Sequence, residues 1–134
     1  MKIALSLSLS LMISALCLGQ HAAMDCSLFK TGKFSYFDSL NHTIFVTRKK
    51  HKQEEYNYQT NVKTVLNIKW ITDCSYKITQ TWSDSKAKRK FNGTYTIVSI
   101  TKIIGDNEGY EYSCSCEDVN LQMKNKGIMR KEQD

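Results

Sequence analysis

The sequence predicts an all-β protein of about eight antiparallel strands, folded as a small up-and-down barrel. Apolar and polar residues alternate with a period of two through nearly all of the chain after residue 23. The links between the alternating segments have hairpin length and are rich in Gly, Asn, Asp and Ser, while proline is absent. Closing such a meander into a barrel hides its two edge strands, and a two-sheet sandwich is the alternative.

The expected strands of the first half follow one another through short turns. Ile44 and Val46 share one face of the second strand, and Tyr56 and Tyr58 share one face of the third. In the fourth and clearest strand, Leu66, Ile68 and Trp70 point the same way, and the Thr72-Asp73 step after it suits a tight hairpin. The strands expected in this half are 33–37, 43–49, 53–59, 63–71 and 74–82.

A charged loop over residues 83–90 and an Asn92-Gly93 turn separate the two halves. The next strand is long and β-branched, and its alternation slips near Val98, which predicts a bend there. After a Gly-rich hairpin loop, four residues alternate on one face of the following strand: Tyr110, Tyr112, Cys114 and Cys116. The strands expected in this half are 94–104, 110–116, and two short ones at 119–123 and 128–131.

The first residues are typical of a secretory signal peptide. A Lys2 start precedes an apolar run that is too short to span a bilayer, and small or polar residues follow it. Cleavage after Gly19 or after Ala23 is expected; a buried core helix is the alternative, and Leu16 disfavours lipidation of Cys17. We therefore expect a signal peptide over 1–19, a single β-domain over 24–134, no membrane span in it, and export to the periplasm or outside the cell.

Cysteine content agrees with export. Loss of Cys17 with the leader leaves Cys26, Cys74, Cys114 and Cys116, an even number in a small exported chain, which is typical of disulfide bonds. The sequence does not choose between the possible pairings.

Two segments resemble a family of small exported proteins from Bacteroidota. They are residues 26–36, with the sequence CSLFKTGKFSY, and residues 70–76, with the sequence WITDCSY. The strand over 94–104 and the Gly127-Ile128-Met129 step also fit, so the resemblance covers most of the chain after the leader. It implies a compact, lipocalin-like β-meander and no particular activity. Some members carry a DNA topoisomerase name, which no ATP-binding or metal-carboxylate motif supports in this chain.

Cys26 and Cys74 lie inside the two matched segments, and the resemblance therefore implies that they pair. Such a bond closes a loop of about 49 residues and contributes about 4 kcal/mol by loop-closure entropy; two buried thiols are the alternative. Cys114 and Cys116 lie outside the shared pattern, and in an extended strand their Cα atoms are about 6.5 to 7 Å apart, at the limit for a direct bridge. A bridge, two buried thiols, and a redox or soft-metal pair remain open for them.

The aromatic residues fall mostly on the apolar sides of the expected strands. Either they fill the core, or some of them line a cavity that holds one small apolar ligand. The candidate ligand-lining residues are Tyr56, Tyr58, Trp70, Tyr76, Trp82, Tyr110 and Tyr112.

The formal net charge is +6, and positive residues gather in three clusters. The candidate basic patch is Lys86, Lys88, Arg89 and Lys90, which either forms a solvated loop or meets an acidic partner such as a polysaccharide, an anionic lipid or a protein. Export argues against nucleic acid as that partner.

Signals of catalysis are missing from the sequence. It has no Gly-x-Ser-x-Gly motif, no phosphate-binding loop and no histidine pattern with metal-ligand spacing. We expect a non-catalytic exported domain without cofactor or metal, which binds a small molecule or a cell-envelope partner or serves as a structural accessory.

Overall fold

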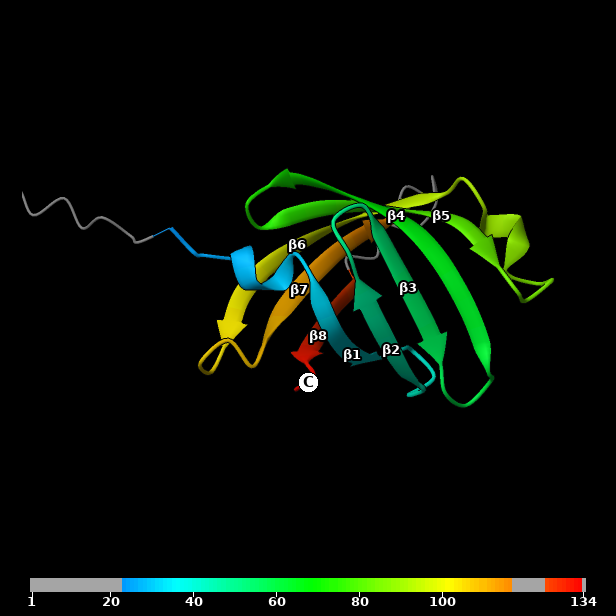
Figure 1. Ribbon diagram of the computed structural model, residues 1–134, viewed down its shortest axis with the longest axis horizontal. Coiled ribbons are helices and arrows are strands. Elements are labelled where there is room, and N and C mark those ends of the chain that lie inside the picture. Colours follow the sequence, from blue (N-terminus) through cyan, green and yellow to red (C-terminus); the bar gives the residue numbers. More distant parts are fainter. Residues whose placement is uncertain (1–22, 117–124, 134) are drawn as a thin grey trace, which may run out of the picture.

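The computed structural model describes residues 23–116 and 125–133, and within them eight antiparallel strands close into one barrel (Figure 1). Each strand pairs with its sequence neighbours, and β1 pairs with β8 to complete the circle. The predicted all-β up-and-down barrel is confirmed. Its strands are β1 (Gly32–Phe37), β2 (Thr43–Arg48), β3 (Lys52–Asn57), β4 (Val62–Thr72), β5 (Ser75–Ser83), β6 (Tyr95–Ile104), β7 (Gly109–Cys116) and β8 (Asn125–Lys131).

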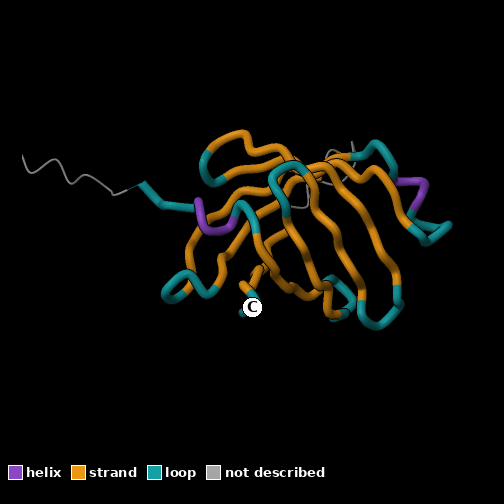
Figure 2. The backbone as a smooth tube through the Cα atoms, in the orientation of Figure 1, coloured by secondary structure: helices purple, strands orange, loops and turns teal. Residues whose placement is uncertain are grey.

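Two single-turn 3-10 helices accompany the strands (Figure 2). The helix η1 (Ser27–Phe29) precedes β1, and η2 (Arg89–Phe91) lies in the charged connection between β5 and β6. The expected signal peptide and the expected short strand at 119–123 fall outside the described residues, whereas the expected strand at 128–131 is the second part of β8.

Asparagine residues occupy three of the turns between strands. Asn41, Asn61 and Asn107 adopt positive φ angles of 61°, 55° and 60° in the β1–β2, β3–β4 and β6–β7 turns. Asparagine and glycine tolerate this left-handed conformation better than other residues do. The turns therefore fix the hairpin registers that decide which side chains face inward.

Three register shifts interrupt the longer strands, and one of them, between Trp70 and Thr72, adjoins the β4–β5 turn. Val65 pairs with Trp82 while Leu66 pairs with Gln80, so Thr81 is an extra residue in β5. Thr101 is the extra residue in β6, because Ile100 pairs with Tyr112 and Lys102 with Glu111. The bend predicted near Val98 is thus found at Thr101.

The two ends of the barrel differ. At the sealed end, on the left in Figure 1, η1 lies at the same end of the barrel as the β4–β5 and β6–β7 turns, and its Phe29 is fully buried against Tyr110 with ring centroids 5.0 Å apart. The open end, on the right, carries the β3–β4 turn and the connection between β5 and β6. The core therefore lies toward the sealed end.

A disulfide bond between Cys26 and Cys74 fastens η1 to the barrel, as the resemblance predicted. Cys74 lies in the two-residue turn between β4 and β5 rather than in the expected strand, and its Cα atom is 5.4 Å from that of Cys26. Because Cys26 is fully buried, the bond is part of the core. A buried disulfide is typical of proteins in an oxidising compartment.

Candidate functional site

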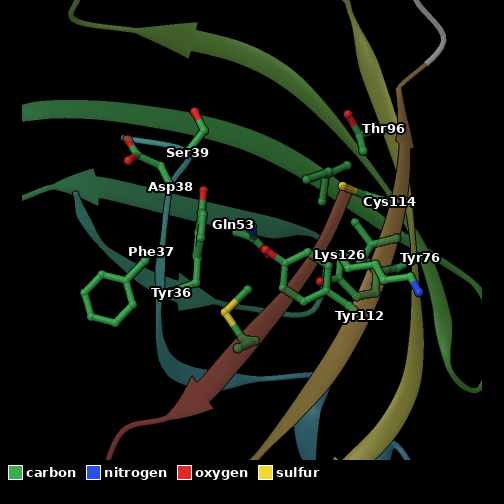
Figure 3. A pocket seen from close by; sticks show the side chains of 13 residues that line it. Tyr36, Phe37, Asp38, Ser39, Gln53, Tyr76, Thr96, Tyr112, Cys114 and Lys126 are labelled. Atoms are coloured by element: carbon green, nitrogen blue, oxygen red, sulfur yellow. The ribbon is translucent and has the colours of Figure 1, made fainter. Parts of the chain in front are cut away.

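A cavity of about 410 Å³ enters the barrel from the open end (Figure 3). The β1–β2 turn contributes Asp38 and Ser39 to its rim, and Lys126 on β8 joins them there. Its walls combine apolar groups with phenol and thiol groups from five strands: Tyr36, Ile78, Val98, Tyr112, Cys114 and Met129. The volume lies within the range of small-molecule sites, about 300 to 1,000 Å³.

Gln53 and Tyr76 connect this cavity to a buried arginine. Both side chains line the cavity, and both are only 1% exposed. Arg48 Nε donates to Gln53 Oε1 at 2.9 Å, and one terminal nitrogen of Arg48 donates to the hydroxyls of Tyr76 at 3.1 Å and Tyr110 at 3.2 Å. Gln53 and Tyr76 therefore form the floor of the cavity and also belong to the hydrogen-bond network around Arg48.

The guanidinium of Arg48 closes the barrel beneath that floor. It lies 4.9 Å from the ring centroid of Phe34 and 4.6 Å from that of Tyr76, and its other terminal nitrogen donates to the carbonyl of Phe29 at 2.7 Å. Planar cations stack on aromatic faces and form several hydrogen bonds at once. Arg48 thus links η1, β1 and β5 around one buried charge.

The inner face of β3 extends the polar network. Gln53 Nε2 donates to one carboxylate oxygen of Glu55 at 2.7 Å, and the hydroxyl of Tyr36 donates to the other at 3.1 Å. Asn57, further along the same face, is 5% exposed. One wall of the barrel interior is therefore hydrophilic, unlike the aliphatic faces of β2 and β6.

The phenols around the cavity stay protonated at neutral pH. Burial raises the pKa of Tyr76 well above its usual value, and burial together with the Glu55 carboxylate does the same for Tyr36. Burial and the neighbouring Cys114 raise the pKa of Tyr112 to about 12. These side chains therefore act as neutral hydrogen-bonding groups.

The predicted ligand-lining residues separate into three groups. Tyr76 and Tyr112 line the cavity, whereas Tyr110 is fully buried behind Tyr76 and does not reach it. Trp70 packs on Tyr76 at the sealed end, with ring centroids 4.8 Å apart.

The remaining three, Tyr56, Tyr58 and Trp82, lie on the outer surface, with 39%, 65% and 45% of each residue exposed. Their predicted inward orientation was wrong. In the β2–β3 hairpin, Glu55 lies opposite Val46 and Asn57 opposite Ile44, which turns the two tyrosines outward. The extra residue Thr81 reverses the alternation of β5 before Trp82.

Cys114 is half-buried in the cavity wall, near Tyr112. The side chain of Cys116 lies outside the described residues, so the three possibilities for this pair stay as predicted. Within the described part of the chain, no group of three or more His, Cys, Asp and Glu side chains could hold a metal ion. None of the described helices has the length and apolar character needed to cross a membrane.

The predicted basic patch lies on the connection between β5 and β6. Its residues Lys86, Lys88, Arg89 and Lys90 are all exposed, and Arg89 holds the connection together by donating to the carbonyls of Ser83 and Asp84. The ammonium of Lys90 lies 5.0 Å from the ring centroid of Phe91.

A second group of basic residues gathers at the sealed end, which the sequence did not predict. Lys30, Lys50, His51 and Lys69 line a notch of about 310 Å³, together with Thr31, Ile68 and Trp70; we call it the lysine notch. The ammonium of Lys30 lies 5.4 Å from the ring centroid of Trp70. Among the described side chains, Trp70 Nε1 is the one buried polar atom without a hydrogen-bond partner.

Arg48 and Gln53 are the site residues that sequence reasoning missed. Arg48 directly precedes the basic residues Lys49 and Lys50, yet it continues the inward alternation of Ile44 and Val46. Gln53 lies directly opposite Arg48 across a three-residue turn. Extending the alternation by one step and applying the hairpin register would have placed both inside.

Comparison with family models, curated proteins and solved structures gives no match for this chain. The resemblance drawn from residues 26–36 and 70–76 therefore stays a prediction.

Proposed function

We propose that this protein is an exported, non-catalytic binding protein that holds one small, largely apolar molecule in the cavity at the open end of the barrel. The observation that carries the proposal is the cavity of about 410 Å³ inside a barrel whose opposite end is sealed. A sealed end holds the ligand on one side, so the ligand would enter from the open end. Its aliphatic and aromatic walls remove apolar surface from water, which is the main driving force for binding such a molecule.

Titration with Nile red, a neutral apolar dye whose emission rises on leaving water, tests this proposal. We expect saturable binding to the oxidised protein that lacks residues 1–23. Ile78→Trp places a large ring in the cavity and should abolish the signal. Thr79→Trp puts the same ring on the next residue of β5, where the alternation points it outward, and should bind like the wild type.

Near-ultraviolet circular dichroism verifies that both variants are folded. If Ile78→Trp proves unfolded, Val98→Phe fills the cavity from β6 instead. Dye binding that both cavity-filling variants retain would refute the proposal.

A second candidate function is adhesion to an acidic polysaccharide. The lysine notch favours it, because cations ring an aromatic face there, and carboxylated or sulfated sugars match both features. The predicted patch at Lys86, Lys88, Arg89 and Lys90 is the competing location.

Heparin retention separates the two locations. We expect Lys30→Ala/Lys50→Ala/Lys69→Ala to lower the salt concentration needed for elution. Lys86→Ala/Lys88→Ala/Lys90→Ala removes the same charge but keeps Arg89, which holds the connection, and should elute later than the notch variant. Equal elution of the two variants would show a charge effect without a site, and stronger retention on anionic liposomes than on heparin would favour lipid.

A further inference from the structure

The buried polar network has more hydrogen-bond donors than acceptors. Arg48 has five N–H groups, and four of them donate within the described residues to Gln53, Phe29, Tyr76 and Tyr110. No carboxylate is among these partners. The positive charge is therefore held by neutral acceptors alone, and its field extends toward the cavity floor.

The two phenols at this floor have one proton in excess. The hydroxyls of Tyr76 and Tyr110 each accept a hydrogen bond from Arg48 and lie 2.9 Å apart. Only one of them can donate to the other, so the second phenol proton has no acceptor in the described structure. Tyr76 is the member of this pair that lines the cavity.

Gln53 adds a second unused donor at the same place. Its amide nitrogen has two N–H groups, and one of them donates to Glu55. Both Gln53 and Tyr76 are almost completely buried, so solvent at the outer surface does not satisfy these groups. A buried donor without an acceptor is costly, which favours a ligand that supplies one.

Nearer the mouth of the cavity, the lining also includes a hydrogen-bond donor without an acceptor. The hydroxyl of Tyr112 lines the cavity and makes no hydrogen bond to any described residue, and Lys126 is another of the lining residues. The carboxylate of Glu55 lies outside the lining and is occupied by Gln53 and Tyr36, while that of Asp38 accepts from the backbone of Leu40 and His42. The cavity therefore offers unused hydrogen-bond donors, while its two nearby carboxylates already accept hydrogen bonds from the protein.

We infer that the ligand of this cavity is an amphipathic monocarboxylate whose carboxylate lies at the floor, against Gln53 and Tyr76, and whose apolar part lies against Ile78, Val98 and Met129. The inference rests on the proposed function, since it names the chemical class that the same cavity binds. Charge-assisted hydrogen bonds from a desolvated site are stronger than neutral ones. An amine with the same apolar part would bring a second cation to a site that already holds Arg48.

Competition against bound Nile red tests the inference with decanoate, decan-1-ol and decylamine at neutral pH, each below its micelle concentration. The three compounds share one alkyl chain and differ in the head group. We expect decanoate to bind about tenfold more tightly than decan-1-ol, the difference that one charge-assisted hydrogen bond provides, and decylamine to bind weakest.

Variants at the cavity then locate the head group. Gln53→Met keeps a similar volume but removes the amide donor, and should lower decanoate affinity about tenfold while leaving decan-1-ol affinity nearly unchanged. Lys126→Gln and Tyr112→Phe lie nearer the mouth and should cost about threefold each. Lys102→Gln and Tyr58→Phe make the same chemical changes away from the cavity and should have no effect.

The outcomes separate this inference from the proposed function. Equal affinities for the three compounds, or tightest binding of decylamine, would overturn the inference while the cavity remained a binding site. Failure of Nile red and all three compounds to bind would refute both. If Gln53→Met does not fold, an unchanged ratio of decanoate to decan-1-ol affinity in both Lys126→Gln and Tyr112→Phe would overturn the inference.

Discussion

The sealed and open ends of this barrel are built from the same strands, yet they differ in packing. At the sealed end, Cys26, Phe29, Arg48 and Tyr110 are at most 2% exposed, and the Cys26–Cys74 disulfide, an edge-to-face ring contact and hydrogen bonds hold this end together. At the open end, half-buried residues such as Ile78 surround a cavity. Stability is thus concentrated at one end, which leaves the other free to keep an unfilled interior for a ligand.

Removing the disulfide at the sealed end should lower the free energy of unfolding more than any other change proposed here. Cys26→Ala/Cys74→Ala releases η1 from the β4–β5 turn and restores the entropy of a long loop in the unfolded chain. We expect the free energy of unfolding to fall by about 4 kcal/mol in urea titrations. A loss below about 1 kcal/mol would show that η1 is held by packing alone.

Replacing Arg48 should have the next largest effect. Arg48→Ala leaves Gln53, Tyr76 and the Phe29 carbonyl without their donor and opens a void between stacked rings. We expect a loss of about 3 kcal/mol in urea titrations. Arg130→Ala, at an exposed position on β8, removes the same side chain and should change stability by less than about 0.5 kcal/mol.

Two glycines of the β7–β8 pair allow a direct comparison of the ends. A Cβ atom at Gly109, on the sealed side, would meet the backbone oxygen of Met129 at 2.3 Å, whereas one at Gly127 would meet the Tyr112 hydroxyl at 2.4 Å. The Met129 backbone is held in the sheet and cannot move away from the new Cβ atom, but the Tyr112 ring can rotate into the neighbouring cavity.

Thermal unfolding should therefore show a loss of about 2 kcal/mol for Gly109→Ala and less than about 1 kcal/mol for Gly127→Ala. Because the displaced ring takes up space in the cavity, Gly127→Ala should also weaken Nile red binding. Equal destabilisation by the two variants would contradict the difference in packing between the ends.

Alkaline pH should lower the stability of the fold by the smallest amount, and neutral pH should not lower it. The folded state holds the pKa values of Tyr36, Tyr76 and Tyr112 above the ordinary value of about 10. Their contribution to stability is complete below about pH 10 and is lost as the pH rises through the folded-state values, with Tyr112 at about 12.

Urea midpoints measured from about pH 9 to about pH 12 should fall with increasing pH. Tyr112→Phe should make the decline shallower, and Tyr58→Phe, on the outer surface, serves as the control. The same slope in Tyr112→Phe and wild type would show that this phenol titrates as it does in the unfolded chain.

Several features of the fold followed from local patterns. Alternation with a period of two, hairpin-length links and turn-forming residues such as Asn41 depend only on neighbouring residues, so they predicted the strands and the antiparallel order. The inward position of Ile44 and Val46 followed in the same way. The Cys26–Cys74 pair came from the resemblance rather than from spacing.

The inner surface was harder to predict, because a shift of one residue moves every later side chain to the opposite face. Trp82 was misplaced by the bulge at Thr81, and Tyr56 and Tyr58 by the register of the β2–β3 hairpin. In a strand that alternates charged and aromatic residues, the aromatic side is the usual choice for the core. Here β3 instead turns Gln53, Glu55 and Asn57 inward, and Gln53 accepts a hydrogen bond from Arg48 while Glu55 accepts one from Tyr36.

The strand order, the turns and the class of the fold could be predicted from the sequence, because each of these depends on residues close together in the chain. The sealed end, the cavity at the opposite end and the buried guanidinium between them became visible in the folded barrel. Those features depend on Phe29, Arg48, Tyr76 and Tyr110, which come from separate elements and meet only when the sheet closes.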